Sequence, residues 1–156
     1  MAEYGYNAVQ NVSLNQPLIF NSSIPCNRGL VLHDDETGNF ILRGNTPNCF
    51  ARYQIVYNGN IAIPTGGAVT PIAVAIAVNG DARPTSRAIV TPAATAADPP
   101  TTENFFNVTS TAIITVPKGC CFNLSVRYVA ADEDPATTPT PVIEVQNSNL
   151  TIARIA

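Results

Sequence analysis

One short segment of this 156-residue chain gathers side chains that could do chemistry. His33-Asp34-Asp35-Glu36 offers three carboxylates and an imidazole nitrogen in a row, and these are the kinds of side chain that ligate cations. A calcium site draws its oxygen ligands from alternating positions, however, and contiguous acids cannot all face one ion without further partners. The segment is therefore interpreted as an exposed hairpin turn between strands at 29–32 and 39–43, with Asp34, Asp35 and Glu36 kept as calcium candidates.

The other reactive side chains are four cysteines, at Cys26, Cys49, Cys120 and Cys121. Their spacing contains no pair of C-x2-C units, so a structural zinc site is not expected. Two interpretations stay open: buried thiols in a reducing compartment, or disulfides formed after release from the cell. Because Cys120 and Cys121 are adjacent in a strand-like run, we expect one to face the core and the other a neighbouring subunit.

Motifs for catalysis are missing from the sequence. It contains neither a G-x-S-x-G nucleophile elbow nor a phosphate-binding glycine loop, and His33 is the single histidine. A position at the surface or rim explains this histidine as well as a role as general base does. The sequence predicts a protein that is not an enzyme and that needs no cofactor, calcium being the one candidate ion.

The elements that must position these residues are short strands. Thirteen prolines and nine glycines interrupt the chain at intervals that suit strands and break long helices. Apolar residues recur with a period of two at 53–57 and 122–128, and 72–78 has the pattern of a strand buried on both faces. Asn79-Gly80 predicts a hairpin turn, and Asn58-Gly59 is a second candidate for one. About ten strands are expected, in an all-β sandwich or barrel.

Composition limits the partners of the chain. Charged residues make up only 12 % of it, the net charge is −3, the pI is near 4.9, and the arginines are scattered. About 25 % is typical of a domain. Nucleic acid is not an expected partner, because phosphate binding needs clustered cations. No apolar run is long enough for a membrane span, and the first residues lack the basic and apolar regions of a classical signal peptide. We expect no membrane contact.

The length suits one domain with one core. We expect residues 1–16, which are polar and contain two tyrosines, to form an amino-terminal arm or attachment segment, with a disordered terminus as the alternative. Residues 17–156 would then form the folded domain.

Several segments, taken in order, resemble the C1q/TNF-like jelly-roll family. They are TGNFILRG (37–44), ARYQIVYNGNIAI (51–63), PIAVAIAVNG (71–80), VTSTAIITVPKGCCFNLSVRY (108–128) and NSNLTIARIA (147–156). The chain is most similar to the C-terminal domains of bacterial spore-surface collagen-like glycoproteins and to phage fibre-head or decoration proteins. Cys120-Cys121 replaces the acidic residue that usually follows the family's turn. The resemblance implies an antiparallel jelly-roll sandwich and a homotrimer that buries a central apolar interface.

These observations favour a self-assembling structural protein over other functions. We expect a homotrimer on a surface assembly, namely a spore surface, an extracellular filament, or a virion decoration or fibre head, reached without a classical signal peptide. Scarce charge would then reflect burial between subunits. The alternative is a trimeric module that binds a surface receptor or a glycan through apical loops at 81–104 and 130–141.

Overall fold

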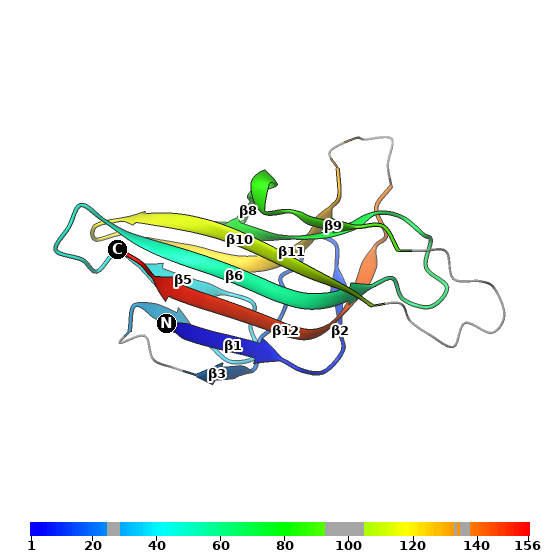
Figure 1. The fold of residues 1–156 in the computed structure, drawn as a ribbon, viewed down its shortest axis with the longest axis horizontal. Helices are drawn as coiled ribbons and strands as arrows, with labels where there is room; N and C mark the ends of the chain where they lie inside the picture. Colours follow the sequence, from blue (N-terminus) through cyan, green and yellow to red (C-terminus); the bar gives the residue numbers. More distant parts are fainter. Residues whose placement is uncertain (25–28, 93–104, 133, 135–137) are drawn as a thin grey trace.

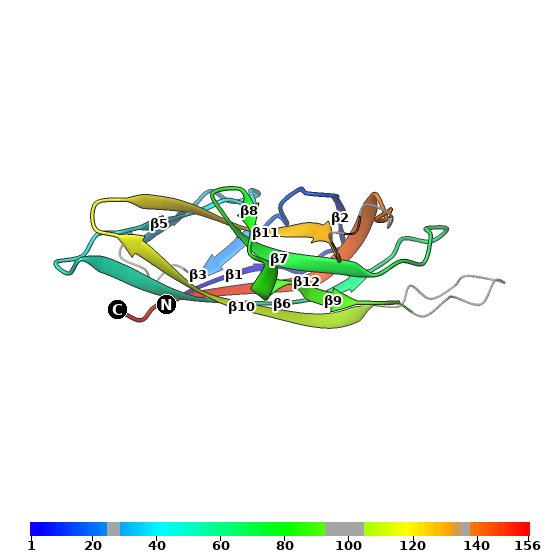
Figure 2. The ribbon, with the colours of Figure 1, turned by 90° about the horizontal axis from the view of Figure 1, so that it is seen from above.

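The computed structural model describes residues 1–24, 29–92, 105–132, 134 and 138–156. This part of the chain forms two stacked antiparallel sheets in an elongated molecule, with both termini at one end (Figure 1; Figure 2). The expected all-β antiparallel architecture is confirmed. Within the described residues there are twelve strands rather than about ten, because several edge segments pair over only two or three residues.

Sheet A contains the long strands of the molecule. In spatial order its main strands are β10 (Phe106–Pro117), β6 (Phe50–Ala62), β12 (Val142–Arg154), β1 (Ala2–Tyr6) and β3 (Ser22–Ile24), and β2 (Gln10–Ser13) also pairs with β12. Alternating burial along β6 and β10 turns one side of this sheet to the core and the other side away from it.

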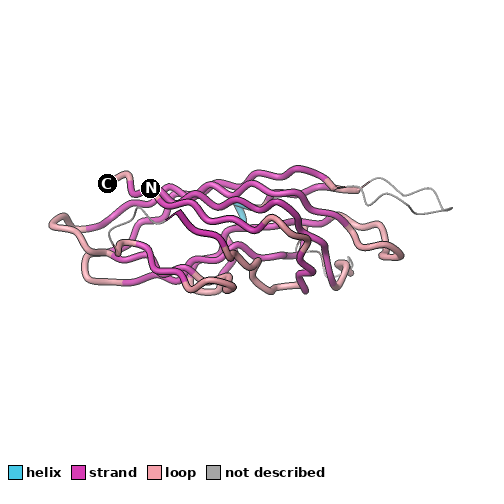
Figure 3. Tube along the Cα trace, turned by 90° about the horizontal axis from the view of Figure 1, so that it is seen from below, coloured by secondary structure: helices cyan, strands magenta, loops and turns pink. Residues whose placement is uncertain are grey.

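Sheet B covers the core from the other side. Its spatial order is β4 (Val31–His33), β5 (Phe40–Arg43), β11 (Cys121–Ala130), β7 (Ile72–Val78) and β8 (Asp81–Ala82), and β9 (Ala88–Val90) also pairs with β7. A single turn of 3-10 helix at Pro84–Ser86 separates β8 from β9 and is the only helical element within the described residues (Figure 3). No helix in this part of the chain is long and apolar enough to cross a membrane.

The core forms where the inward positions of the two sheets meet. The period-two pattern predicted for 53–57 and 122–128 is confirmed, since Tyr53, Tyr57 and Tyr128 are fully buried. The strand at 72–78 is buried on both faces, as expected: its Ile and Val side chains enter the main core, and its alanines form the opposite face. Burying each large apolar side chain stabilises the fold by about 1.5–3 kcal/mol.

The amino-terminal segment differs from the expected arm. β1 lies between β12 and β3 in sheet A, and Tyr4 is only 3 % exposed. β2 pairs with the first part of β12, so both strands of residues 1–16 belong to the sandwich (Figure 1). The alternation of buried Ala2 and Tyr4 with exposed Glu3 marks β1 as a strand, although its polar composition conceals this in the sequence.

The two Asn-Gly pairs behave differently. Asn79 and Gly80 have φ values of 53° and 92°, and they form the two-residue turn between β7 and β8 that the sequence predicts. The expectation of a turn at Asn58-Gly59 is wrong, because both residues lie within β6 and pair with β10 and β12. Neither has a positive φ, so this Asn-Gly pair is ordinary extended chain.

Candidate functional site

The side of sheet A that faces away from the core is uncharged over the middle of β6 and β10. The side chains on this side come from the positions that alternate along each strand with the positions facing the core. On these two strands they are Gln54, Val56, Asn58, Asn60, Asn107, Thr109, Thr111, Ile113 and Thr115. Amides and hydroxyls dominate this middle part of the outward face, with Val56 and Ile113 as its large apolar members, and the outward side of β6 continues with Arg52 and Phe50 toward the start of the strand.

Side-chain hydrogen bonds link the two strands across this outward face. The Asn58 amide nitrogen donates to the Asn107 amide oxygen at 3.2 Å and to the Thr109 hydroxyl at 2.8 Å. The Asn107 amide donates in return to Asn58 at 3.2 Å and to Asn60 at 3.1 Å. The network fixes the orientation of these amides and uses the donors of Asn58 and Asn107, so that their amide oxygens keep only acceptor capacity.

The edge of sheet A at β10 is uncharged as well. Within the described residues β10 pairs only with β6, and its twelve residues contain no charged side chain. Ile113 on β10 is 56 % exposed, and Ile89 on the adjoining β9 is 54 % exposed. Solvent-facing sheet edges are usually protected by charges, prolines or covering elements, so this edge is suited to contact with another chain.

A shallow depression lies beside this edge. It has a volume of about 390 Å³ and is lined by Gln54, Thr85, Thr111, Ala112 and Ile113. The Ser110 hydroxyl donates to the Ser86 carbonyl oxygen and so ties the 3-10 turn to β10 next to it. No ionisable side chain is among the residues that line the depression.

The acidic candidates lie in the predicted hairpin turn. Asp34, Asp35 and Glu36 are exposed, and β4 and β5 flank them as expected. The Thr37 N–H donates to the Asp34 carbonyl oxygen at 3.2 Å, and Glu36 has a φ of 63°, so the segment is a tight turn. Within the described residues no group of three or more His, Cys, Asp and Glu side chains is arranged to hold a metal ion. Calcium binding stays a prediction.

His33 belongs to β4 and turns away from these acids. Its ring stacks on Phe40 with a centroid separation of 4.1 Å and meets the edge of Tyr4 at 5.0 Å. Its Nδ1 lies 3.1 Å from the Asn39 carbonyl oxygen, and its Nε2 lies 3.2 Å from that of Phe20. Both ring nitrogens therefore contact backbone oxygens, and the geometry gives His33 a packing role between the hairpin and the 18–21 segment.

The described cysteines are exposed rather than buried, and the interpretation that they form disulfides after release stays a prediction. Cys49, Cys120 and Cys121 are exposed free thiols, so the expectation of buried cysteines is wrong for these three. Cys120 lies in the turn that follows β10 and Cys121 begins β11, so neither faces the core. The turn explains the difference, because strand alternation does not extend to Cys120. Cys26 lies outside the described residues.

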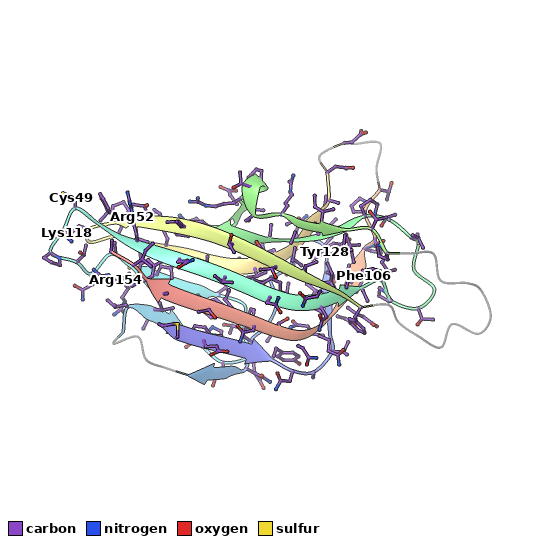
Figure 4. The ribbon with its side chains drawn as sticks, viewed as in Figure 1. Cys49, Arg52, Phe106, Lys118, Tyr128 and Arg154 are labelled. Carbon is purple, nitrogen blue, oxygen red and sulfur yellow. The ribbon has the colours of Figure 1, made fainter. Side chains whose placement is uncertain are left out.

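The fold brings these three cysteines to one end of the sandwich. Phe50 of β6 pairs with Pro117 of β10, and the Lys118 N–H donates to the Cys49 carbonyl oxygen at 2.9 Å. Figure 4 shows Cys49, Lys118, Arg52 and Arg154 together at this end, away from Phe106. Sequence reasoning did not predict this cluster, because its members are up to 105 positions apart, from Cys49 to Arg154, and only strand pairing joins them.

The asparagine network was also not predicted from sequence. The sequence favours a turn at Asn58-Gly59, and no local motif marks Asn60, Asn107 and Thr109 as its partners. A signal for them did exist: Asn and Thr occupy every second position at 107–111, opposite to the parity of Val108 and Ser110.

The fold defines the class of structure to which the chain belongs, a C1q/TNF-like jelly-roll sandwich. Among solved structures the globular domain of zebrafish complement 1qA is similar, with a TM-score of 0.55 and 14 % identity over 96 % of this chain and 92 % of that one. The Eiger TNF of S. frugiperda is similar with a TM-score of 0.56 and 13 % identity, over 100 % and 92 % of the two chains. Identities this low show the fold alone.

Comparison at the level of sequence adds no family. No protein-family model matches the chain, and no curated protein matches it. The resemblance to bacterial spore-surface and phage fibre-head domains stays a prediction.

Proposed function

We propose that this chain is a non-enzymatic structural protein that assembles as a homotrimer through the outward face of sheet A. The observation that carries the proposal is the uncharged middle of the outward face of β6 and β10, beyond Arg52, together with the uncharged edge at β10. A surface without charged side chains does not repel a second copy electrostatically. Sheet surfaces that face solvent normally carry charged side chains. Burial of this face between subunits also accounts for the 12 % charge of the chain.

The shape of the uncharged surface favours a ring. The β10 edge, with exposed Ile89 and Ile113, and the outward face of sheet A are different surfaces that meet along one strand. A contact between the edge of one subunit and the face of the next is heterologous, because it joins two different surfaces. Repeating such a contact gives a closed ring when a whole number of the rotations between neighbouring subunits adds up to 360°. A three-membered ring of this kind agrees with the homotrimer that the C1q/TNF-like resemblance implies.

The character of the interface differs from the expectation. The resemblance to the C1q/TNF-like family implies a central apolar interface, whereas the middle of the outward face of β6 and β10 consists mainly of amides and hydroxyls, with Val56 and Ile113 as apolar side chains. The amide oxygens of Asn58 and Asn107 each accept one of these bonds and keep a second lone pair that can accept a bond from a neighbouring chain. The proposed interface is hydrogen-bonded at its centre and apolar toward the β10 edge.

The setting is part of the same proposal. A spore surface, an extracellular filament or a virion decoration or fibre head would each use a compact trimer that exposes little charge. The alternative, a receptor- or glycan-binding module, rests on the loops at 81–104 and 130–141. Residues 93–104, 133 and 135–137 of those loops lie outside the described part of the chain, so the structure offers no site for that alternative.

The mass of the protein in solution tests the proposal. Light scattering after size-exclusion chromatography should give three times the 16.5 kDa chain mass, in the presence of reductant. Thr111→Arg places a cation on the outward face of β10, where each interface of the ring would bury one unpaired charge, and an unpaired buried charge costs several kcal/mol. This variant should have the mass of one chain.

Asn123→Arg is the matched control, because Asn123 is exposed on the opposite side of the molecule, on β11 of sheet B. It should keep the wild-type mass. A wild-type protein with the mass of one chain would contradict the proposal, and so would a folded Thr111→Arg protein that stays trimeric.

A further inference from the structure

The end of the sandwich that carries the three exposed cysteines is also rich in cations, and we call it the basic end. Its members are Arg43, Cys49, Arg52, Lys118, Cys120, Cys121 and Arg154. Four of the eight cations in the chain thus lie near three of its four cysteines (Figure 4). No ion pair to a carboxylate side chain is present for these four cations among the described residues.

No acidic side chain pairs with a cation at this end among the described residues, although Arg154 Nε donates to an oxygen of Ala156, at the carboxyl end of the chain, at 3.1 Å. Lys118 Nζ lies 3.4 Å from the Pro47 carbonyl oxygen, and Arg154 Nη1 donates to the Asn45 carbonyl oxygen at 2.8 Å. The Arg52 guanidinium lies over the Phe50 ring at 4.9 Å from its centroid. The positive charge of the basic end is therefore not neutralised by side chains and is available to an anion.

An open depression in the basic end is lined by two of these cations, Arg43 and Lys118. It has a volume of about 390 Å³ and is lined by Arg43, Gly44, Asn45, Thr46, Lys118, Gly119, Cys120 and Cys121. No acidic side chain lines it. Its floor is rigid, because the Gly44 N–H donates to the Cys120 carbonyl oxygen at 2.8 Å and the Gly119 N–H donates to the Gly44 carbonyl oxygen at 3.0 Å.

Close packing of the backbone keeps the depression open. A side chain at Gly44 would collide with the Pro117 carbonyl, so this position accepts only glycine without a shift of backbone. Gly119 has a φ of 77° in the turn Pro117–Cys120, the conformation that the third position of a type II turn requires. Two glycines thus hold Cys120 and Cys121 beside Arg43 and Lys118.

We propose that the basic end is a thiol-modification site for anionic disulfides, with Cys120 or Cys121 as the attacking residue. The ligand class is a disulfide whose halves carry net negative charge, such as glutathione disulfide. Cations around the depression would raise the local concentration of such a reagent and speed its encounter with the thiols. The same charge disfavours a disulfide between the basic ends of two copies, because their cations would repel each other.

The chemistry needs no other reactant. The thiolate of the protein attacks one sulfur of the bound disulfide, and a new S–S bond forms as the S–S bond of the reagent breaks. One half of the reagent stays on the protein as a mixed disulfide, and the other half leaves as a thiolate. The cysteine sulfur is oxidised and the leaving half is reduced, so the reagent itself is the oxidant.

Rates of thiol–disulfide exchange on the folded full chain test this proposal. The probes are glutathione disulfide, which is anionic, and cystamine, which is cationic. For each reagent, the exchange rate of the protein is divided by the exchange rate of a neutral cysteine peptide with the same reagent. We expect mass spectrometry to find a preference of roughly tenfold for glutathione disulfide at low ionic strength, which should fall to about twofold at high salt. Digestion should place the adduct on Cys120 or Cys121, and a serine substitution at the reacting position should remove it.

Charge variants separate attraction from simple exposure. Replacing both Arg43 and Lys118 with glutamine should abolish the preference while leaving exchange with cystamine in place. Arg83→Gln is the matched control, since Arg83 lies between β8 and the 3-10 turn and outside the depression, and it should keep the full preference.

Three results would overturn the proposal. They are equal normalised rates for the two reagents, an adduct on Cys49 alone, and a reductant-sensitive dimer of the chain as the main product. Circular dichroism of each variant verifies that exchange is measured on folded protein, and the cystamine rate shows that the thiols stay accessible. The result does not depend on the oligomeric state, because the compared reagents meet the same assembly.

Discussion

At the scale of single residues, buried phenols give this core its polar contacts. Tyr53, Tyr57 and Tyr128 are fully buried, and each hydroxyl lies within hydrogen-bond distance of a backbone carbonyl or, for Tyr57, of the Ser148 hydroxyl. Burial raises the pKa of all three phenols, because a tyrosinate would lose its hydration in the core. The folded state therefore keeps these protons to higher pH than the unfolded chain does.

This difference makes stability depend on alkaline pH. The contribution of each phenol is fully present below the pKa of an unfolded tyrosine, about 10, and is lost as pH rises through the higher pKa of the folded state. We predict that Tyr57→Phe flattens the fall in the free energy of unfolding above pH 10 by up to about 1.4 kcal/mol per pH unit. Urea unfolding from pH 8 to 11, with reductant present, measures the slope.

Tyr6→Phe is the control for this prediction, because Tyr6 lies at the partly exposed end of β1. If Tyr57→Phe left the alkaline slope equal to that of the wild type, the proposed contribution of the buried hydroxyl would be wrong.

At the scale of elements, β6 and β12 fit together through a glycine and a bulge. The pairing of β12 with β6 shifts by one residue between Gln146 and Asn149, so that Asn147 and Ser148 lie opposite Gly59. Asn147 has a φ of 52°, as the extra residue requires. A Cβ at Gly59 would overlap the Tyr57 hydroxyl, and Ser148 lies next to it. Gly59 is thus needed for a close approach rather than for a turn.

We predict that Gly59→Ala destabilises the protein by about 1–3 kcal/mol, because the Tyr57 hydroxyl must move and lose its buried partner. Chemical denaturation measures the change. In a Tyr57→Phe background the same substitution should be less costly, and the difference is the coupling energy of the pair. Gly5→Ala is the matched control, since the nearest atom to its added Cβ would be at an ordinary 3.6 Å. Equal costs for the two glycines would contradict this account.

Local sequence predicts the strands better than it predicts their irregularities. The alternation at 53–57 and 122–128 suffices to identify the buried faces, because burial depends on parity. The same dipeptide forms part of a strand at Asn58-Gly59 and a turn at Asn79-Gly80. At Asn58-Gly59 the pairing of β6 with β10 and β12 keeps the chain extended. The change of parity between Val145 and Leu150, both buried, is a sequence signal for the bulge.

At the scale of the whole molecule, the sequence indicates that surfaces are shared but not which ones. Scarce charge is a property of composition, whereas the outward face of sheet A and the basic end exist only after strand pairing joins distant segments. Arg43, Arg52, Lys118 and Arg154 are scattered in the sequence and gathered in space. We therefore assign the uncharged middle of the outward face of β6 and β10 to contact between copies and the basic end to an anionic reagent.

If folding is coupled to assembly, stability must depend on protein concentration. For a trimer that dissociates as it unfolds, each tenfold dilution lowers the free energy of unfolding by about 0.9 kcal/mol per chain. One trimer gives three unfolded chains, so dilution changes the free energy by 2RT ln 10 per trimer, which is two thirds of RT ln 10 per chain. For a chain of this size we predict a decrease in Tm of about 2–4 °C per tenfold dilution, measured by calorimetry or fluorescence. Thr111→Arg should show a lower Tm without this dependence, and Asn123→Arg should keep it. A wild-type Tm that stays constant over a hundredfold dilution would mean that the subunits fold independently of each other.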